Sequence, residues 1–169
     1  MASGTSKSLA FILLVLNLVL YAIVAIIAGW AIDYGIRHTP QSASTLSIPV
    51  RMFPIYFPIG NTATGFFVIF SLIAGLVGVA TSISGINNVI QWTLPNLLSA
   101  ATYSITTWSL TLLAMGLACK EINIGWSDSN LRTLEVLTII LSGTQLFYVV
   151  AIHAGITDAE RQSYRGGRY

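Results

Sequence analysis

The stretch from Met52 to Cys119 contains no Asp, Glu, Lys or Arg over its sixty-eight residues and reads MFPIYFPIGNTATGFFVIFSLIAGLVGVATSISGINNVIQWTLPNLLSAATYSITTWSLTLLAMGLAC. It is too long for a single core element of a soluble protein. It is long enough for two crossings of a lipid bilayer of about 20 residues each, with a turn between them. Two further runs without these charged residues flank it, Ser8–Ile32 and Val136–Thr157. The sequence therefore predicts a membrane protein with four spans.

The overall composition agrees with this class. The chain is 54% hydrophobic and 8% charged, whereas soluble domains carry about 25% charged residues. A formal net charge of +2, with no basic stripe, argues against a nucleic-acid partner. Cys119 is the single cysteine, which excludes an intrachain disulfide and a cysteine-based metal site. We expect one membrane domain that needs neither a metal nor a cofactor.

We place the spans at about 9–32, 62–84, 97–119 and 134–155, followed by a polar, basic tail at 156–169. In lipid each span must satisfy its own backbone polar groups, so helices are expected. The short links favour an all-α fold, a compact antiparallel bundle of four transmembrane helices. An even number of spans puts both termini on one side. The basic residues are shared equally between the two sides, and the basic tail then favours cytosolic termini.

Span two carries small residues three or four apart on one helical face, namely Ser71, Ala74, Gly75, Gly78, Ser82 and Gly85. Lipid provides no hydrophobic drive for helix association, and small faces let membrane helices approach closely. We interpret this face as an internal packing surface. Two alternatives are a smooth wall for a flat ligand and a contact between copies of the chain in a homo-oligomer.

Span four has the most informative pattern. At about 100° per residue, six of its residues lie within about 80° of one another, and they are Glu135, Thr138, Ser142, Gln145, Val149 and His153. Span three has a partial counterpart in Ser99, Thr102, Thr106 and Ser109. Asn17 lies near the middle of span one and is expected to bond another helix. Polar residues inside membranes mark substrate or proton pathways. The alternative is a buried hydrogen-bond network that joins spans one, three and four.

The sequence has no pattern of a known enzyme class. The two histidines, His38 and His153, belong to different regions, and neither a phosphate-binding glycine loop nor an HExxH motif occurs. We interpret as a solvated rim the one remaining group of titratable residues, which consists of Lys120, Glu121, Asp128, Arg132 and Glu135. We expect no enzymatic activity.

Four strings of the chain carry a family resemblance: LLVLNLVLYAIVAIIAGWAID, FPIYFPIGNTATGFFVIFSLIAGLVGVATSISG, LACKEINIG and LEVLTIILSGTQLFYVVAIHAG. Together they resemble the plant AWPM-type family, the abscisic-acid-induced plasma-membrane polypeptides also called PM-nineteen-like proteins. The likeness covers about Leu9 to Gly155. It is most specific at Leu117–Gly125 and at the proline and aromatic residues before span two. None of the strings is a catalytic motif.

The resemblance implies a four-span plasma-membrane protein of plants, induced by abscisic acid, cold, drought or seed maturation. It further implies that the protein takes up abscisic acid into cells. Such a small, mostly apolar acid suits a pocket with apolar walls and a few polar groups. Within the bundle we expect Asn17, Ser142 and Gln145 to hydrogen-bond this ligand.

Charged residues would act at the ends of the pathway. Arg132 or Lys120 is expected to attract the carboxylate of the hormone, and Glu135 or His153 to exchange a proton with it. A carboxylate that crosses lipid alone loses its hydration at a large cost in free energy. The alternative function is a tetraspan protein that stabilises the membrane under dehydration or docks a partner, without transport. Membrane lipids are expected partners in either case.

Overall fold

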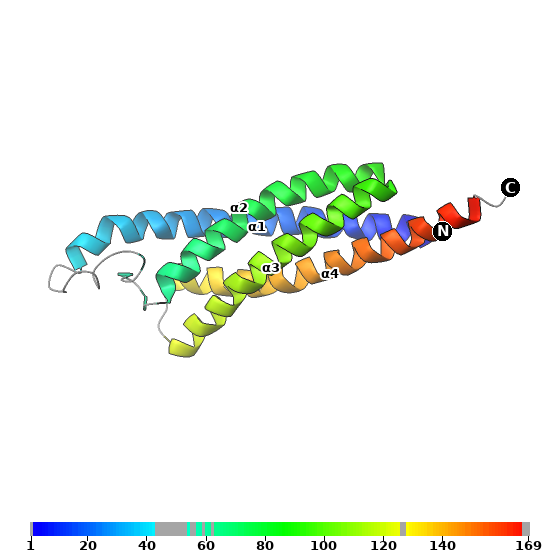
Figure 1. Cartoon of the computed structure of the whole chain (residues 1–169). Helices are drawn as coiled ribbons and strands as arrows, with labels where there is room; N and C mark the ends of the chain where they lie inside the picture. Colours follow the sequence, from blue (N-terminus) through cyan, green and yellow to red (C-terminus); the bar gives the residue numbers. More distant parts are fainter. Residues whose placement is uncertain are drawn as a thin grey trace.

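In the computed structural model, the described residues are 2–42, 54, 57–58, 60–61, 63–125 and 128–166. They form four α-helices, α1 (Ala2–Ser42), α2 (Thr64–Gln91), α3 (Leu94–Ile124) and α4 (Ser129–Gly166). Figure 1 shows an elongated antiparallel bundle with both chain ends at the same end. The predicted all-α bundle is confirmed, and the helices extend beyond the apolar spans.

Three of the described helices are long and apolar enough to cross a bilayer, within Gly4–His38, Thr64–Gln91 and Ser129–Tyr164. The chain is therefore a multi-pass membrane protein. α3 has 31 residues but is less apolar, because many of its side chains carry hydroxyl groups. It packs against both α2 and α4, so a crossing by these two helices would take α3 with them. The crossing by α3 itself stays a prediction.

Each helix packs against two neighbours, in the order α1, α2, α3, α4 and back to α1. The turn between α2 and α3 has only two residues, Trp92 and Thr93. Trp92 adopts a left-handed conformation with a φ of 46°, and its ring packs on α4, where a Cβ on Gly155 would lie 2.9 Å from it. Pro95 lies in the first turn of α3, where its missing N–H leaves no helical hydrogen bond unmade. α3 ends at Ile124, and Gly125, the residue that follows, has a φ of 80°, which suits glycine.

The small-residue face of α2 is buried along its whole length. A Cβ on Gly75 would lie 3.0 Å from the backbone nitrogen of Ala25, and a Cβ on Gly78 would lie 2.3 Å from the ring of Tyr21. Both contacts are with α1, so the interpretation as an internal packing surface is confirmed. Because α1 already covers this face, the suggestion that it joins two copies of the chain is wrong.

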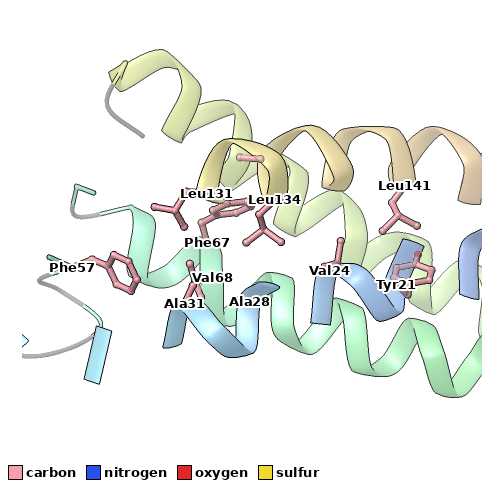
Figure 2. Close-up of a cluster of buried hydrophobic side chains, with 11 residues drawn as sticks. Tyr21, Val24, Ala28, Ala31, Phe57, Phe67, Val68, Leu131, Leu134 and Leu141 are labelled. Carbon is pink, nitrogen blue, oxygen red and sulfur yellow. The ribbon is translucent and has the colours of Figure 1, made fainter. Parts of the chain in front are cut away.

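The apolar core consists of two clusters, one towards each end of the bundle. Figure 2 shows the cluster near the loops between α1 and α2 and between α3 and α4, with Leu131 and Leu134 of α4 facing Phe67 of α2. Phe57, from the segment before α2, is buried in this cluster, and a Cβ on Gly35 of α1 would lie 2.7 Å from its ring. The ring of Phe57 therefore covers part of the loop end of the bundle.

Candidate functional site

A hydrogen-bonded chain of polar groups crosses the middle of the bundle. Asn17 of α1 and Gln145 of α4 are both buried. The Nδ2 of Asn17 donates to the Oε1 of Gln145 at 2.8 Å, and the Nε2 of Gln145 donates to the backbone carbonyl of Ser104 in α3 at 3.3 Å. The prediction that Asn17 bonds another helix is confirmed. The Oδ1 of Asn17 is buried, and no described residue donates a hydrogen bond to it.

A second set of polar contacts involves hydroxyl groups of α1, α2 and α3. The hydroxyl oxygens of Tyr21 and Thr111 lie 2.8 Å apart, across the centre of the bundle. Because the hydroxyl of Thr111 donates to the carbonyl of Thr107, Tyr21 is the donor to Thr111. The hydroxyls of Thr81 and Thr107 also lie 2.8 Å apart. Polar groups therefore join all four helices at mid-depth.

Replacing Tyr21 by phenylalanine tests how much this second set stabilises the bundle. The change removes one hydrogen bond but leaves the proton of Thr111 bonded to Thr107. We expect a loss of about 0.5–1.5 kcal/mol in unfolding free energy, measured as a lower thermal midpoint of the purified protein. Tyr164→Phe changes an exposed tyrosine and should leave the midpoint unchanged. Equal midpoints for both variants would show that the Tyr21 hydrogen bond adds no stability.

Ser142 lies at the contact between α3 and α4. Its hydroxyl lies 2.7 Å from the carbonyl of Ile139 and 3.0 Å from the sulfur of Met115. The backbone carbonyl of Ser142 accepts a hydrogen bond of 3.1 Å from the indole Nε1 of Trp108. The central tryptophan of α3 therefore helps to hold α4, as a packing role predicts.

A narrow crevice opens beside Gln145. It has about 180 Å³ of empty space, which is too thin at every point to hold a water molecule. Its lining combines polar and apolar side chains from all four helices, among them Leu14, Thr81, Ser104, Gln145 and Tyr148. The Oη of Tyr148 is buried and has no hydrogen-bond partner in the described part of the chain. In this conformation the polar interior is closed, and a hormone-sized ligand enters it only if the helices separate.

The hydroxyl stripe expected on α3 faces away from the bundle. Ser99, Thr102, Thr106 and Ser109 are exposed, and the last three donate to the carbonyl four residues earlier in their own helix. The expectation that they match the stripe of α4 was wrong. The buried hydroxyls of α3 belong to Ser104, Thr107 and Thr111 instead. α3 carries hydroxyls on both faces, so the pattern alone did not identify the inner face.

The stripe of α4 is buried over only part of its length. Glu135, Thr138, Ser142 and Gln145 face the interior, whereas His153 is exposed and its Nδ1 lies 2.8 Å from the carbonyl of Val149. Towards the chain termini, Tyr148 and Ile152 face the interior instead. A row of residues spaced three and four apart turns slowly around a helix that has 3.6 residues per turn, so it leaves the inner face. Lys120 and Arg132 are exposed as well. The structure thus joins Asn17 and Gln145 by a hydrogen bond and buries Ser142 at the contact between α3 and α4, but places Lys120, Arg132 and His153 on the outside.

The mixed-charge group at the loop end is not simply a solvated rim. Glu121 is 0% exposed and Glu135 is 2% exposed, so that interpretation was wrong for these two residues. The hydroxyl of Thr64, also buried, donates to Oε1 of Glu121. Among the described residues, the Oε2 of Glu121 and the Oε1 of Glu135 are buried without a hydrogen-bond partner. We call Glu121 and Glu135 the buried glutamate pair.

The electrostatics of this pair follow from its burial. Glu121 lies beyond the predicted third span, and loss of hydration raises the pKa of its carboxyl above 4.5, although the hydrogen bond from Thr64 opposes this. The amide nitrogen of Asn61 approaches the same carboxyl without completing a hydrogen bond. Negative charge on Glu121 disfavours the ionised form of Glu135, whereas the positive charge of Arg132 favours it.

A shallow groove lies on the outer side of α4, next to the buried pair in sequence. It has a volume of about 290 Å³ and is lined by Ser129, Arg132, Thr133, Val136 and Leu137. The groove therefore combines one cation with hydroxyl and apolar side chains. We call it the Arg132 groove.

Sequence reasoning missed several interior contacts. Tyr21 lies four residues after Asn17 and shares its helix face, but its hydrogen bond with Thr111 depends on how α3 is rotated. Thr64 and Thr111 gave no signal in the sequence, because their roles depend on which face of α2 and α3 turns inward. Within the described residues no group of three His, Cys, Asp or Glu side chains is placed to hold a metal ion.

Comparison with known proteins identifies relatives by sequence. Residues 15–155 match the model of the AWPM-19-like family. A rice protein (Oryza sativa subsp. japonica) named Membrane protein PM19L is 35% identical over 166 residues, which are 98% of this chain and 88% of the rice chain. No solved structure gives a significant match.

Proposed function

Because the chain belongs to the AWPM-19-like family, we propose that it takes up abscisic acid across the plasma membrane. This is the activity that the family resemblance implies, and it would act in responses to drought, cold and seed dormancy. The observation that carries the proposal is the buried polar interior, which runs from the glutamate pair past Gln145 towards Tyr148.

Unpaired polar atoms distinguish this interior from ordinary helix packing. Asn17 Oδ1, Ser71 Oγ and Tyr148 Oη are buried without a partner among the described residues. Buried polar groups in native proteins are nearly all hydrogen-bonded, and each exception needs an explanation. A ligand that passes between the helices would supply the missing donors and acceptors.

The Arg132 groove is a suitable first contact for the hormone. The guanidinium of Arg132 would pair with the carboxylate of the hormone, and Val136 and Leu137 would contact the apolar ring of the hormone. From there the ligand would move inward past Ser142 to Gln145 and Asn17. The helices must separate for this step, because the central crevice is closed.

Binding by the purified protein tests this function. Labelled abscisic acid should bind in a saturable manner to the protein in lipid nanodiscs, and unlabelled hormone should displace it. Arg132→Gln should weaken binding by at least about tenfold, the loss expected when one charge-assisted pair is removed. Arg161→Gln changes an exposed arginine at the other end of the bundle and serves as the control. Absence of saturable binding to the folded protein would refute the proposal.

We further propose that both termini are cytosolic. Cys119 is exposed near the loop end, which would then face outward. A membrane-impermeant maleimide should label Cys119 on intact cells, whereas the Cys119→Ser variant should stay unlabelled. If Cys119 is labelled only after the cells are opened, the loop end is cytosolic and both termini lie outside.

A second candidate function is a tetraspan protein that stabilises the membrane or docks a partner. The closed central crevice favours it, because a purely structural bundle needs no opening. In that case Asn17 and Gln145 would matter for stability but not for hormone movement.

A further inference from the structure

The two glutamates of the buried pair differ in their hydrogen-bond donors. Glu121 accepts from Thr64. The Thr64 hydroxyl in turn accepts from the backbone N–H of Asn61 at 2.7 Å, so its single proton points towards Glu121. A hydroxyl held in this orientation suits an ionised carboxylate, which only accepts hydrogen bonds.

Glu135 has no such donor. Neither of its carboxyl oxygens accepts a hydrogen bond from a described residue, and Oε1 is fully buried. An ionised carboxylate buried without a partner is very costly, so such a group becomes neutral by binding a proton. Negative charge on Glu121 also disfavours negative charge on Glu135, which favours a proton on one of the two.

In the part of the chain that the structure describes, few charged groups lie at the loop end near the pair. On α4, Arg132 attracts charge on Glu135 but is exposed to its surroundings. On α3, Lys120 is exposed, and Asp128 before α4 is exposed too. On α1, Asp33 and Arg37 lie in an exposed ion pair with each other at 2.8 Å. On the α2 side, the polar groups facing the pair are those of Asn61 and Thr64.

We propose that Glu135 carries one exchangeable proton and that the ionised Glu121 favours its retention. A proton on Glu135 removes the cost of a buried charge whose Oε1 has no hydrogen-bond partner among the described residues. The site closes the loop end of the polar interior.

Its use in transport rests on the function proposed above. When the helices separate, a hormone carboxylate that leaves the Arg132 groove and enters the bundle would take the proton from Glu135. The O–H bond of the glutamic acid breaks, an O–H bond forms on the hormone carboxylate, and the neutral acid then enters the bundle. Glu135 recovers a proton from water on the side of entry. Uptake would therefore be driven by a proton gradient.

Infrared spectroscopy of the purified protein, without hormone, tests the proton site directly. At pH 7 the wild-type protein should show the carbonyl band of a protonated carboxylic acid, shifted in D₂O. Glu135→Gln should lose this band, because an amide replaces the neutral acid at similar size. Glu160→Gln alters an exposed glutamate of the same helix and should retain the band. Absence of the band from the wild-type protein would overturn the proposal without any need for a variant.

Thermal stability gives a second measurement. The folded pair holds a proton at neutral pH that an unfolded chain, with glutamates near 4.5, does not. Stability should therefore be greatest at acidic pH and decline as the pH rises above this value, and Glu135→Gln should flatten the decline. If Na⁺ or Ca²⁺ raises the wild-type midpoint at constant pH and has no effect on Glu135→Gln, the pair binds a metal ion and the proton proposal fails. If the proton band is present but liposomes take up no hormone, the transport function fails and the proton site stands.

Discussion

Replacing Gln145 by leucine is expected to reduce abscisic acid uptake by at least about tenfold, equal to 1.4 kcal/mol or more of lost interaction. The change removes the acceptor of Asn17 Nδ2 and the donor to the Ser104 carbonyl. It therefore deletes the only amide pair that joins α1 and α4 among the described residues. Initial uptake rates, normalised to surface protein, give the measurement.

Lost stability must be separated from lost transport in this experiment. Leaving Asn17 buried and unpaired should cost about 1–3 kcal/mol, whereas replacing both partners by apolar groups can be nearly neutral. The double variant Asn17→Leu/Gln145→Leu should therefore regain stability but not uptake. Gln162→Leu, at an exposed position of α4, is the control. A stable double variant with normal uptake would assign the pair to packing alone.

Replacing Gly78 by leucine is expected to disrupt the bundle. A Cβ at this position would already lie 2.3 Å from the ring of Tyr21, and the ring is buried between helices. Overpacking typically costs about 1–3 kcal/mol, and a whole leucine side chain here should exceed that range. The protein should lose most of its monodisperse fraction in size-exclusion chromatography.

Gly116 provides a matched control for this substitution, because a Cβ there would meet nothing within 4 Å. Gly116→Leu should keep the wild-type elution profile. A Gly78→Leu protein that elutes and melts like the wild type would mean that α1 and α2 do not pack through this face.

Much of the fold was predictable because membrane helices follow simple rules. The uncharged stretch from Met52 to Cys119 predicted α2 and α3, and the small residues of α2 predicted close packing. The hydrogen bond of Asn17 to another helix was predictable, because an unpaired amide inside a membrane is costly. These inferences depend on the composition of single helices, which the sequence displays directly.

The contents of the site were less predictable, because they depend on how each helix is rotated. α3 has hydroxyls on two faces, and the sequence did not identify Thr107 and Thr111 as the inner ones. At the loop end, Glu121 follows Lys120 and Glu135 comes three residues after Arg132. These cations made both glutamates look solvated, although each faces inward. That the two glutamates, on different helices, influence each other could be seen only in the folded structure.

Transport is tested by the uptake of labelled abscisic acid into proteoliposomes that contain only the purified protein. We expect saturable uptake that unlabelled hormone competes away, that is faster when the outside is more acidic than the lumen, and that is lost in Gln145→Leu. Liposomes without protein and liposomes with Gln162→Leu are the controls. Uptake by folded wild-type protein that is no faster than into empty liposomes, with or without the proton gradient, would contradict the account and favour the structural tetraspan.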